Sequence, residues 1–196
     1  MLKKLALVLV AAMVLTTIAA AQTLDVYWVN YFTNRNNPTG ADQFVNIINP
    51  GLQGSPLQTT APAEGTLCAN IYVFDAVQEM IECCACPITA NALLSLSVNS
   101  SLTANPLTSV APATGVIKLV STLPNGTACD PTHAGALTPD LRSWGTHLQQ
   151  PTSGTFVTTE GAFAPAPLGA VEAAFLPQAC LFAQYLGTGK AVCVCH

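Results

Sequence analysis

Apolar and polar positions alternate along much of this chain in short runs, and runs with a helical period are scarce. Residues 24–32 (LDVYWVNYF) are rich in aromatic and β-branched side chains, and residues 93–98 (LLSLSV) alternate strictly. Both patterns are typical of strands, and clusters of Gly, Pro and Asn separate such runs as turns do. Strands are predicted at residues 24–32, 43–48, 68–74, 79–84, 93–98, 116–122, 144–149, 155–159 and 191–195.

One segment near the C-terminus favours a helix. Residues 177–186 have Pro177 at the first helical position and Gly187 directly after the last, an asymmetry that helix ends favour. The many short strands indicate an all-β fold. We expect an antiparallel β-sandwich, immunoglobulin-like or pilin-like, with one short C-terminal helix and with disulfides that staple it.

The first residues have the features of a secretory signal. Lys3 and Lys4 form a basic head, residues 5–18 carry no charge, and residues 19–21 are three alanines. This order predicts export and cleavage after Ala21. An uncleaved anchor is the alternative, but the apolar run is shorter than the about 20 residues that span a bilayer. The expected organisation is a signal at residues 1–21 and a single sandwich domain at residues 22–196.

Charge is sparse throughout the chain. Charged residues make up 8% of it, and residues 22–196 keep four Lys and Arg against ten Asp and Glu, a net charge of −6. Four cations cannot neutralise a row of phosphates, and we therefore expect that the protein does not bind nucleic acid. For the same reason we expect no membrane partner once the signal has been cleaved. A surface with so few charges is typical of extracellular β proteins. It is also typical of proteins whose surface is largely buried against other copies of the same chain.

Eight cysteines are the strongest chemical signal in the sequence. An even number in an exported chain predicts four disulfides. Cys83 and Cys84 point to opposite faces of a strand, so they should have different partners. Cys84 shares a face with Cys86. We expect the C-terminal strand to be bonded to the 83–86 segment, and the helix to the sheet. The cysteines are Cys68, Cys83, Cys84, Cys86, Cys129, Cys180, Cys193 and Cys195.

A thiolate metal site is the competing interpretation of the same residues. The segments CCAC and CVCH have the ligand density of a metal cluster, and His196 adds a nitrogen. Neither segment has the C-x₂-C spacing usual in zinc sites, and export favours oxidised thiols. We therefore expect no metal and no other cofactor.

Candidate catalytic residues are few. Ser143, His147 and Asp140 could be drawn as a triad, but no G-x-S-x-G turn accompanies them. Glu79 and Glu82 could act as paired carboxylates, although on a hairpin arm we expect them to keep an exposed surface soluble. We therefore predict that the protein is not an enzyme.

The strand nearest the mature N-terminus is apolar on both faces, which a strand needs if it is buried on both or awaits a partner. Within residues 22–34 it could insert into the open sheet edge of a neighbouring copy. This favours a secreted structural or adhesive protein that forms homo-oligomers or filaments. The residues predicted to mediate assembly are Leu24, Val26, Tyr27, Trp28, Val29, Tyr31 and Phe32.

A monomeric secreted binding domain is the alternative function. The aromatic side chains of the same strand could stack against a glycan, or the domain could bind a protein. An ordinary central strand predicts the same pattern, so the sequence leaves both open.

Overall fold

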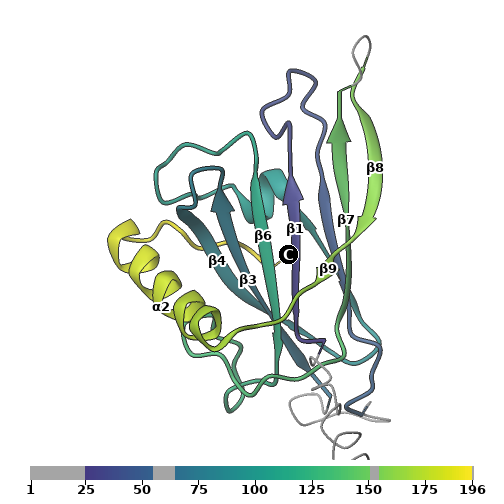
Figure 1. The fold of residues 1–196 in the computed structure, drawn as a ribbon, viewed down its shortest axis with the longest axis vertical. Helices are drawn as coiled ribbons and strands as arrows, with labels where there is room; N and C mark the ends of the chain where they lie inside the picture. The colour runs from purple at the N-terminus through teal and green to yellow at the C-terminus, as the bar shows by residue number, and fades with distance from the viewer. Residues whose placement is uncertain (1–24, 55–64, 151–154, 196) are drawn as a thin grey trace, which may run out of the picture.

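A computed structural model describes residues 25–54, 65–150 and 155–195, and in this part of the chain two antiparallel sheets pair with one α-helix (Figure 1). The first sheet, sheet A, has the strand order β4-β3-β6-β1-β9, and sheet B has the order β5-β2-β7-β8. The predicted signal at residues 1–21 lies outside the described residues, as does Leu24.

The strands are β1 (Tyr27–Phe32), β2 (Phe44–Ile48), β3 (Leu67–Asp75), β4 (Met80–Ile88), β5 (Leu93–Ser97), β6 (Gly115–Thr122), β7 (Arg142–Gln149), β8 (Val157–Ala162) and β9 (Ala164–Pro165). The helices are the single π-turn η1 (Val98–Leu102) and α2 (Ala170–Gly187). None of the helices in the described part of the chain is long and apolar enough to cross a membrane.

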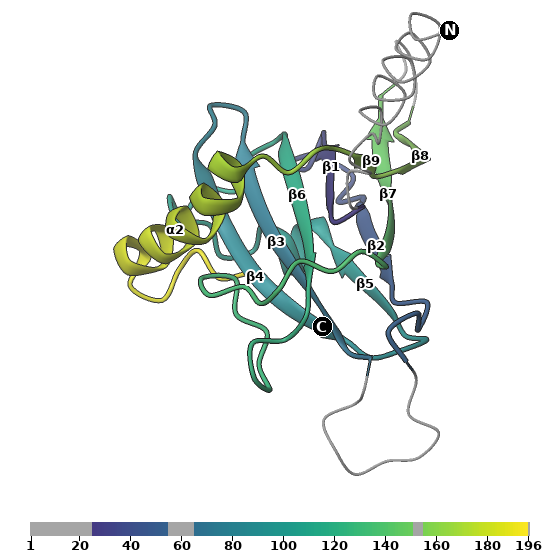
Figure 2. The same ribbon diagram turned by 60° about the horizontal axis from the view of Figure 1, so that its bottom comes forward.

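The elements form three layers. Side chains of sheets A and B meet in one core, which includes Phe32, Ile47 and Ile71. The opposite face of sheet A packs under α2 through Tyr72 and Leu176. Figure 2 shows α2 beside β3 and β4, on the side of them away from β2 and β5. Sheet A is therefore covered on both faces, which explains why every residue of β3 from Leu67 to Phe74 is buried.

The sandwich and most of the predicted strands are confirmed. β1 to β8 lie where strands were predicted, within a few residues at the ends, and β3–β4 and β7–β8 are antiparallel hairpins. The strand predicted at residues 93–98 stops at Ser97, whose side-chain oxygen accepts a hydrogen bond from the Ser100 N–H and begins η1. The strand predicted at residues 191–195 is wrong, because only a parallel bridge between Val192 and Cys83 forms there.

The predicted start of the helix is also wrong. α2 begins at Ala170, so Pro177 lies in its interior rather than at its first position. A proline there removes one backbone hydrogen bond. The segment before it contains three alanines, which favour helix, and Leu176 is buried against sheet A. The packing of Leu176 and the helix propensity of the alanines therefore allow the helix to continue past Pro177.

Four disulfides form, as predicted, and they join sheet A to α2, to the C-terminal tail and to the loop that contains Cys129. Cys83 and Cys84 have different partners: Cys83–Cys180 joins β4 to α2, and Cys84–Cys193 joins β4 to the C-terminal tail. The other two bonds are Cys86–Cys195 and Cys68–Cys129. All four Cα–Cα distances fall between 5.2 and 5.8 Å, the usual range for a disulfide.

Candidate functional site

The two edges of sheet A differ in how they are protected. At the β4 edge the C-terminal tail runs alongside the strand: the Cys83 N–H donates to the Ala191 carbonyl at 3.0 Å, and the Cys193 N–H donates to the Cys83 carbonyl at 3.3 Å. Two disulfides fix the tail there. The tail bonds the backbone of β4 only at Cys83, so it obstructs the middle of this edge, where another molecule would have to displace a disulfide-bonded segment to add a strand.

The other edge of sheet A is only partly covered. β1 pairs with β6 at six positions, from Tyr27 opposite Val120 to Phe32 opposite Gly115. On its other side β9 pairs with β1 at two positions only, Trp28 and Val29. The backbone of β1 beyond Val29 therefore has a partner strand on one side only.

No disulfide loop encloses β1. The four bonds span residues 68–129, 83–180, 84–193 and 86–195. β3 and β4 carry cysteines, and β6 and β9 lie inside these loops. Among the described strands of sheet A, β1 is the one that neither carries a cysteine nor lies inside a disulfide loop.

Most of the residues predicted to mediate assembly are buried in the chain's own domain. Trp28 and Phe32 belong to the core between the sheets. Val26 and Tyr27 lie beneath α2. The Tyr27 hydroxyl donates to Glu172 at 3.4 Å, and burial, reinforced by that carboxylate, raises the pKa of Tyr27 to about 12. Within the single chain, β1 therefore acts as a core strand.

Of the six predicted assembly residues that the structure describes, two reach the surface. Val29 is half-buried, and Tyr31 is 47% exposed. The Tyr31 ring stacks on the His147 ring with centroids 4.3 Å apart. A carbohydrate-stacking surface on this strand is therefore reduced to Tyr31, because Tyr27, Trp28 and Phe32 are buried.

The outer face of α2 is the feature that the sequence prediction missed. Six large apolar side chains of this helix are exposed, with Val171, Phe182 and Tyr185 at 84, 62 and 79%. Its single charged residue, Glu172, is occupied beside Lys118, which also lies over the Phe74 ring. A helix that is apolar all round is normally buried, so this face lacks a cover. The six residues are Val171, Phe175, Leu181, Phe182, Tyr185 and Leu186.

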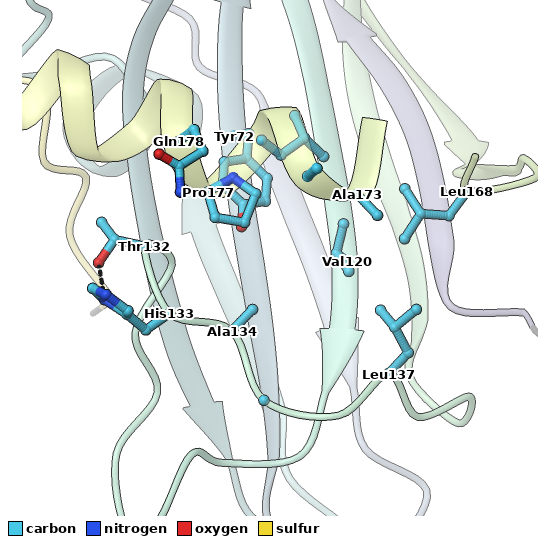
Figure 3. Close-up of a pocket in the computed structure, with 13 residues that line it drawn as sticks. Tyr72, Val120, Thr132, His133, Ala134, Leu137, Leu168, Ala173, Pro177 and Gln178 are labelled. Atoms are coloured by element: carbon cyan, nitrogen blue, oxygen red, sulfur yellow. Dashed lines mark hydrogen bonds between the residues drawn. The ribbon is translucent and has the colours of Figure 1, made fainter. Parts of the chain in front are cut away.

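A hollow of about 400 Å³ lies between α2, the outer face of sheet A and the 132–137 loop (Figure 3). Three of the polar side chains that line it, those of Tyr72, Thr132 and His133, bond within the protein, and Gln178 also lines it. The Tyr72 hydroxyl donates to the Pro131 carbonyl at 2.9 Å, and the Thr132 hydroxyl lies 2.8 Å from Nδ1 of His133. The remaining wall is largely apolar, as at Val120 and Leu168 in Figure 3. The hollow therefore has the shape and the wall to hold a small apolar group.

The candidate triad is not assembled. The Ser143 hydroxyl donates to the Asn46 carbonyl at 2.9 Å, and Asp140 accepts a hydrogen bond from Gln53. His147 is buried against Tyr31, and desolvation lowers its pKa. Each of the three residues therefore has a partner outside the triad.

The two glutamates also separate. Glu79 is exposed, as expected, but the expectation for Glu82 is wrong because that side chain is fully buried. One of its carboxylate oxygens accepts from the Asn105 N–H at 2.8 Å, and the other has no hydrogen-bond partner among the described residues. Burial raises the pKa of Glu82 to about 7.

The sulfur atoms of the proposed thiolate cluster do come together. Cys84, Cys86 and Cys195 place their sulfurs within 4.8 Å of one another. Each sulfur is, however, bonded in a disulfide, to Cys193 or within the Cys86–Cys195 pair. A thiolate ligand set would require these bonds to be reduced.

Comparison with protein-family models found no match, and searches of curated proteins and of solved structures likewise found no similar protein.

Proposed function

We propose that the protein is a secreted structural or adhesive subunit whose copies assemble by exchanging β1. Four disulfides suit an oxidising, extracellular environment. A surface with few charges puts little electrostatic repulsion between copies. The strand to be exchanged lies within residues 22–34, for which the sequence predicts insertion into a neighbouring copy.

The observation that supports it is the position of β1 outside every disulfide loop of sheet A. The other strands of that sheet carry disulfides or lie within disulfide loops, which restrict the unfolding of the remainder when β1 departs. The β4 edge is obstructed at Cys83 by the C-terminal tail, which two disulfides hold in place. The groove left beside β6 would then have the register and the core pockets that fit a β1 strand from another copy.

Exchange costs few contacts because the incoming strand is identical to the outgoing one. A neighbour's β1 would remake the same six pairs with β6 and return Trp28 and Phe32 to the same core. Identical elements swapped between protomers are a low-cost route to oligomers, and a head-to-tail exchange that does not close gives a filament.

A cross-link across the β1–β6 pair tests the exchange. Tyr31 lies opposite Val116 in the register, and neither is fully buried. In a Tyr31→Cys/Val116→Cys variant assembled at high concentration and then oxidised, exchange gives covalent oligomers on a denaturing, non-reducing gel. Each single-cysteine variant is the control, since Tyr31→Cys or Val116→Cys alone has no partner cysteine at this register.

The opposite result is equally clear. If every cross-link in the double variant is intramolecular, β1 stays in its own sheet and exchange is rejected. A mature protein that remains strictly monomeric would favour the alternative function, a monomeric binding domain for a glycan or protein.

A further inference from the structure

The outer face of α2 repeats the spacing of a helix–helix seam. Val171, Phe175, Gln178, Phe182 and Tyr185 follow one another at intervals of four, three, four and three residues. This is the a/d spacing by which two helices pack together. The same 4-3-4 spacing recurs on the opposite side of α2, in the residues docked against the rest of the fold: Leu176, Cys180, Ala183 and Gly187. The helix therefore carries two seams, and one of them is free.

The free seam has the size of one half of a protein interface. With aromatic side chains of 150–250 Å² each, the six exposed residues present roughly 700 Å² of apolar surface. The largest apolar patch on a typical monomer is about 300–600 Å², while each partner of a standard interface buries about 800 Å². The area matches what a stable pair needs.

A twofold axis at Gln178 would place exposed positions of α2 opposite one another, with Phe182 facing Ala174 of the other copy. Val171 and Tyr185 each lie seven residues from Gln178, and Phe175 and Leu181 each lie three residues from it. In an antiparallel helix pair with its twofold axis at Gln178, Val171 meets Tyr185 of the other copy. The Gln178 amide, which is both donor and acceptor, meets its own equivalent. Such a contact is isologous, so one patch completes itself.

The charges point to the same partner. Helices that lie on membranes carry Lys and Arg beside their apolar face, whereas α2 has neither. Its one carboxylate, Glu172, is held by Lys118 and Tyr27. A face without charge offers nothing to attract a lipid headgroup or a charged protein, and it offers nothing to repel a copy of itself.

We infer that two copies of this chain pair through the outer face of α2, antiparallel about Gln178. This contact is separate from the exchange of β1, and it joins protomers through the opposite face of sheet A from the one that packs on sheet B. Exchange links copies head to tail, and α2 pairing links them side to side.

Single cysteines placed along the seam test the geometry in the oxidised, full-length mature protein. Gln178→Cys lies on the axis and cross-links to itself. Val171→Cys and Tyr185→Cys each fail alone but cross-link when the two variants are mixed. Leu93→Cys, which is exposed on β5 of sheet B, is the matched control and does not cross-link.

A charge in the seam tests the energetics. Phe182→Glu raises the dissociation constant of the pair at least about tenfold in sedimentation equilibrium, because it desolvates a carboxylate in an apolar contact. Leu93→Glu leaves the constant unchanged. Phe182 is exposed, so circular dichroism of the variant shows an intact fold.

Three results would overturn the pairing. They are a wild-type protein that stays monomeric at its solubility limit, Gln178→Cys cross-linking no faster than Leu93→Cys, and binding to phosphatidylcholine vesicles that Phe182→Glu abolishes without any dimer. The pairing and the strand exchange fail separately. Phe182→Glu leaves the intermolecular Tyr31–Val116 cross-link intact, and locking β1 in its own sheet leaves the Gln178 cross-link intact.

Discussion

Glu82 is an ionisable residue in surroundings that disfavour its charged form. It is a fully buried carboxyl in β4 with one oxygen bonded to the Asn105 N–H and the other unpartnered among the described residues. A buried carboxylate without hydrogen-bond partners is costly, and protonation relieves the cost. Burial raises its pKa to about 7, an effect that the Asn105 N–H and the Arg35 charge partly offset.

The raised pKa predicts that stability falls as the pH rises. The folded protein holds the Glu82 proton up to about pH 7, whereas the unfolded chain releases it near its ordinary value of about 4.3. The contribution to the unfolding free energy is therefore fully present below about pH 4 and is lost through pH 7, by about 3 kcal/mol. Glu82→Gln should remove this slope and be more stable than wild type at pH 8.

Urea unfolding at a series of pH values measures this effect. Glu79→Gln is the matched control, because Glu79 is exposed on the same hairpin, and it should keep the wild-type slope. Equal slopes for Glu82→Gln and wild type would show that the Glu82 carboxyl does not hold its proton in the fold.

At the scale of elements, the strands could be predicted from alternation, as in β5, or from a run of aromatic and β-branched residues, as in β1. The spacing of Cys83, Cys84 and Cys86 also predicted that Cys83 and Cys84 have different partners, since alternation decides the face of each sulfur, but the four pairings themselves come from the structure. The helix start could not be predicted, because Pro177 resembles a first position and only packing on sheet A shows otherwise. With the helix cut at Pro177, the seam beginning at Val171 stayed hidden.

The bond between Cys83 and Cys180 is predicted to hold α2 on sheet A. Both cysteines are fully buried, and the bond closes a separation of 97 residues, for which chain entropy gives about 4–5 kcal/mol. A Cys83→Ala/Cys180→Ala variant should melt at a lower temperature, and α2 should become the first site of proteolytic cleavage.

A second disulfide provides the control for this variant. The bond between Cys68 and Cys129 closes a separation of 61 residues and does not touch α2. Its removal should lower the melting temperature by a similar amount and leave α2 protected. Early cleavage of α2 in both variants would mean that the helix depends on overall stability rather than on its own disulfide.

The whole molecule divides into a cross-linked part and a free part. β3, β4, β6, α2 and the C-terminal tail are joined by the four disulfides or lie within their loops, whereas β1 and β2 lie before the first cysteine of the chain. Disulfides restrict the unfolded ensemble only of the segments they enclose. The free part should therefore open at a lower free energy than the remainder.

Native-state hydrogen exchange tests this division, since local opening and global unfolding give separate free energies. In the oxidised protein, the amides of β1 that bond to β6 should exchange through a partial opening, while those of β3 and β4 should exchange only on global unfolding. Phe32 and Trp28 leave the core in that opening, so it is the state from which a strand can be exchanged. After reduction of the disulfides, the opening free energies of the β1 amides and of the β3 and β4 amides should become similar. If β1 in the oxidised protein exchanges as slowly as β3, the strand is committed to its own sheet, and copies of the chain can meet only through their surfaces.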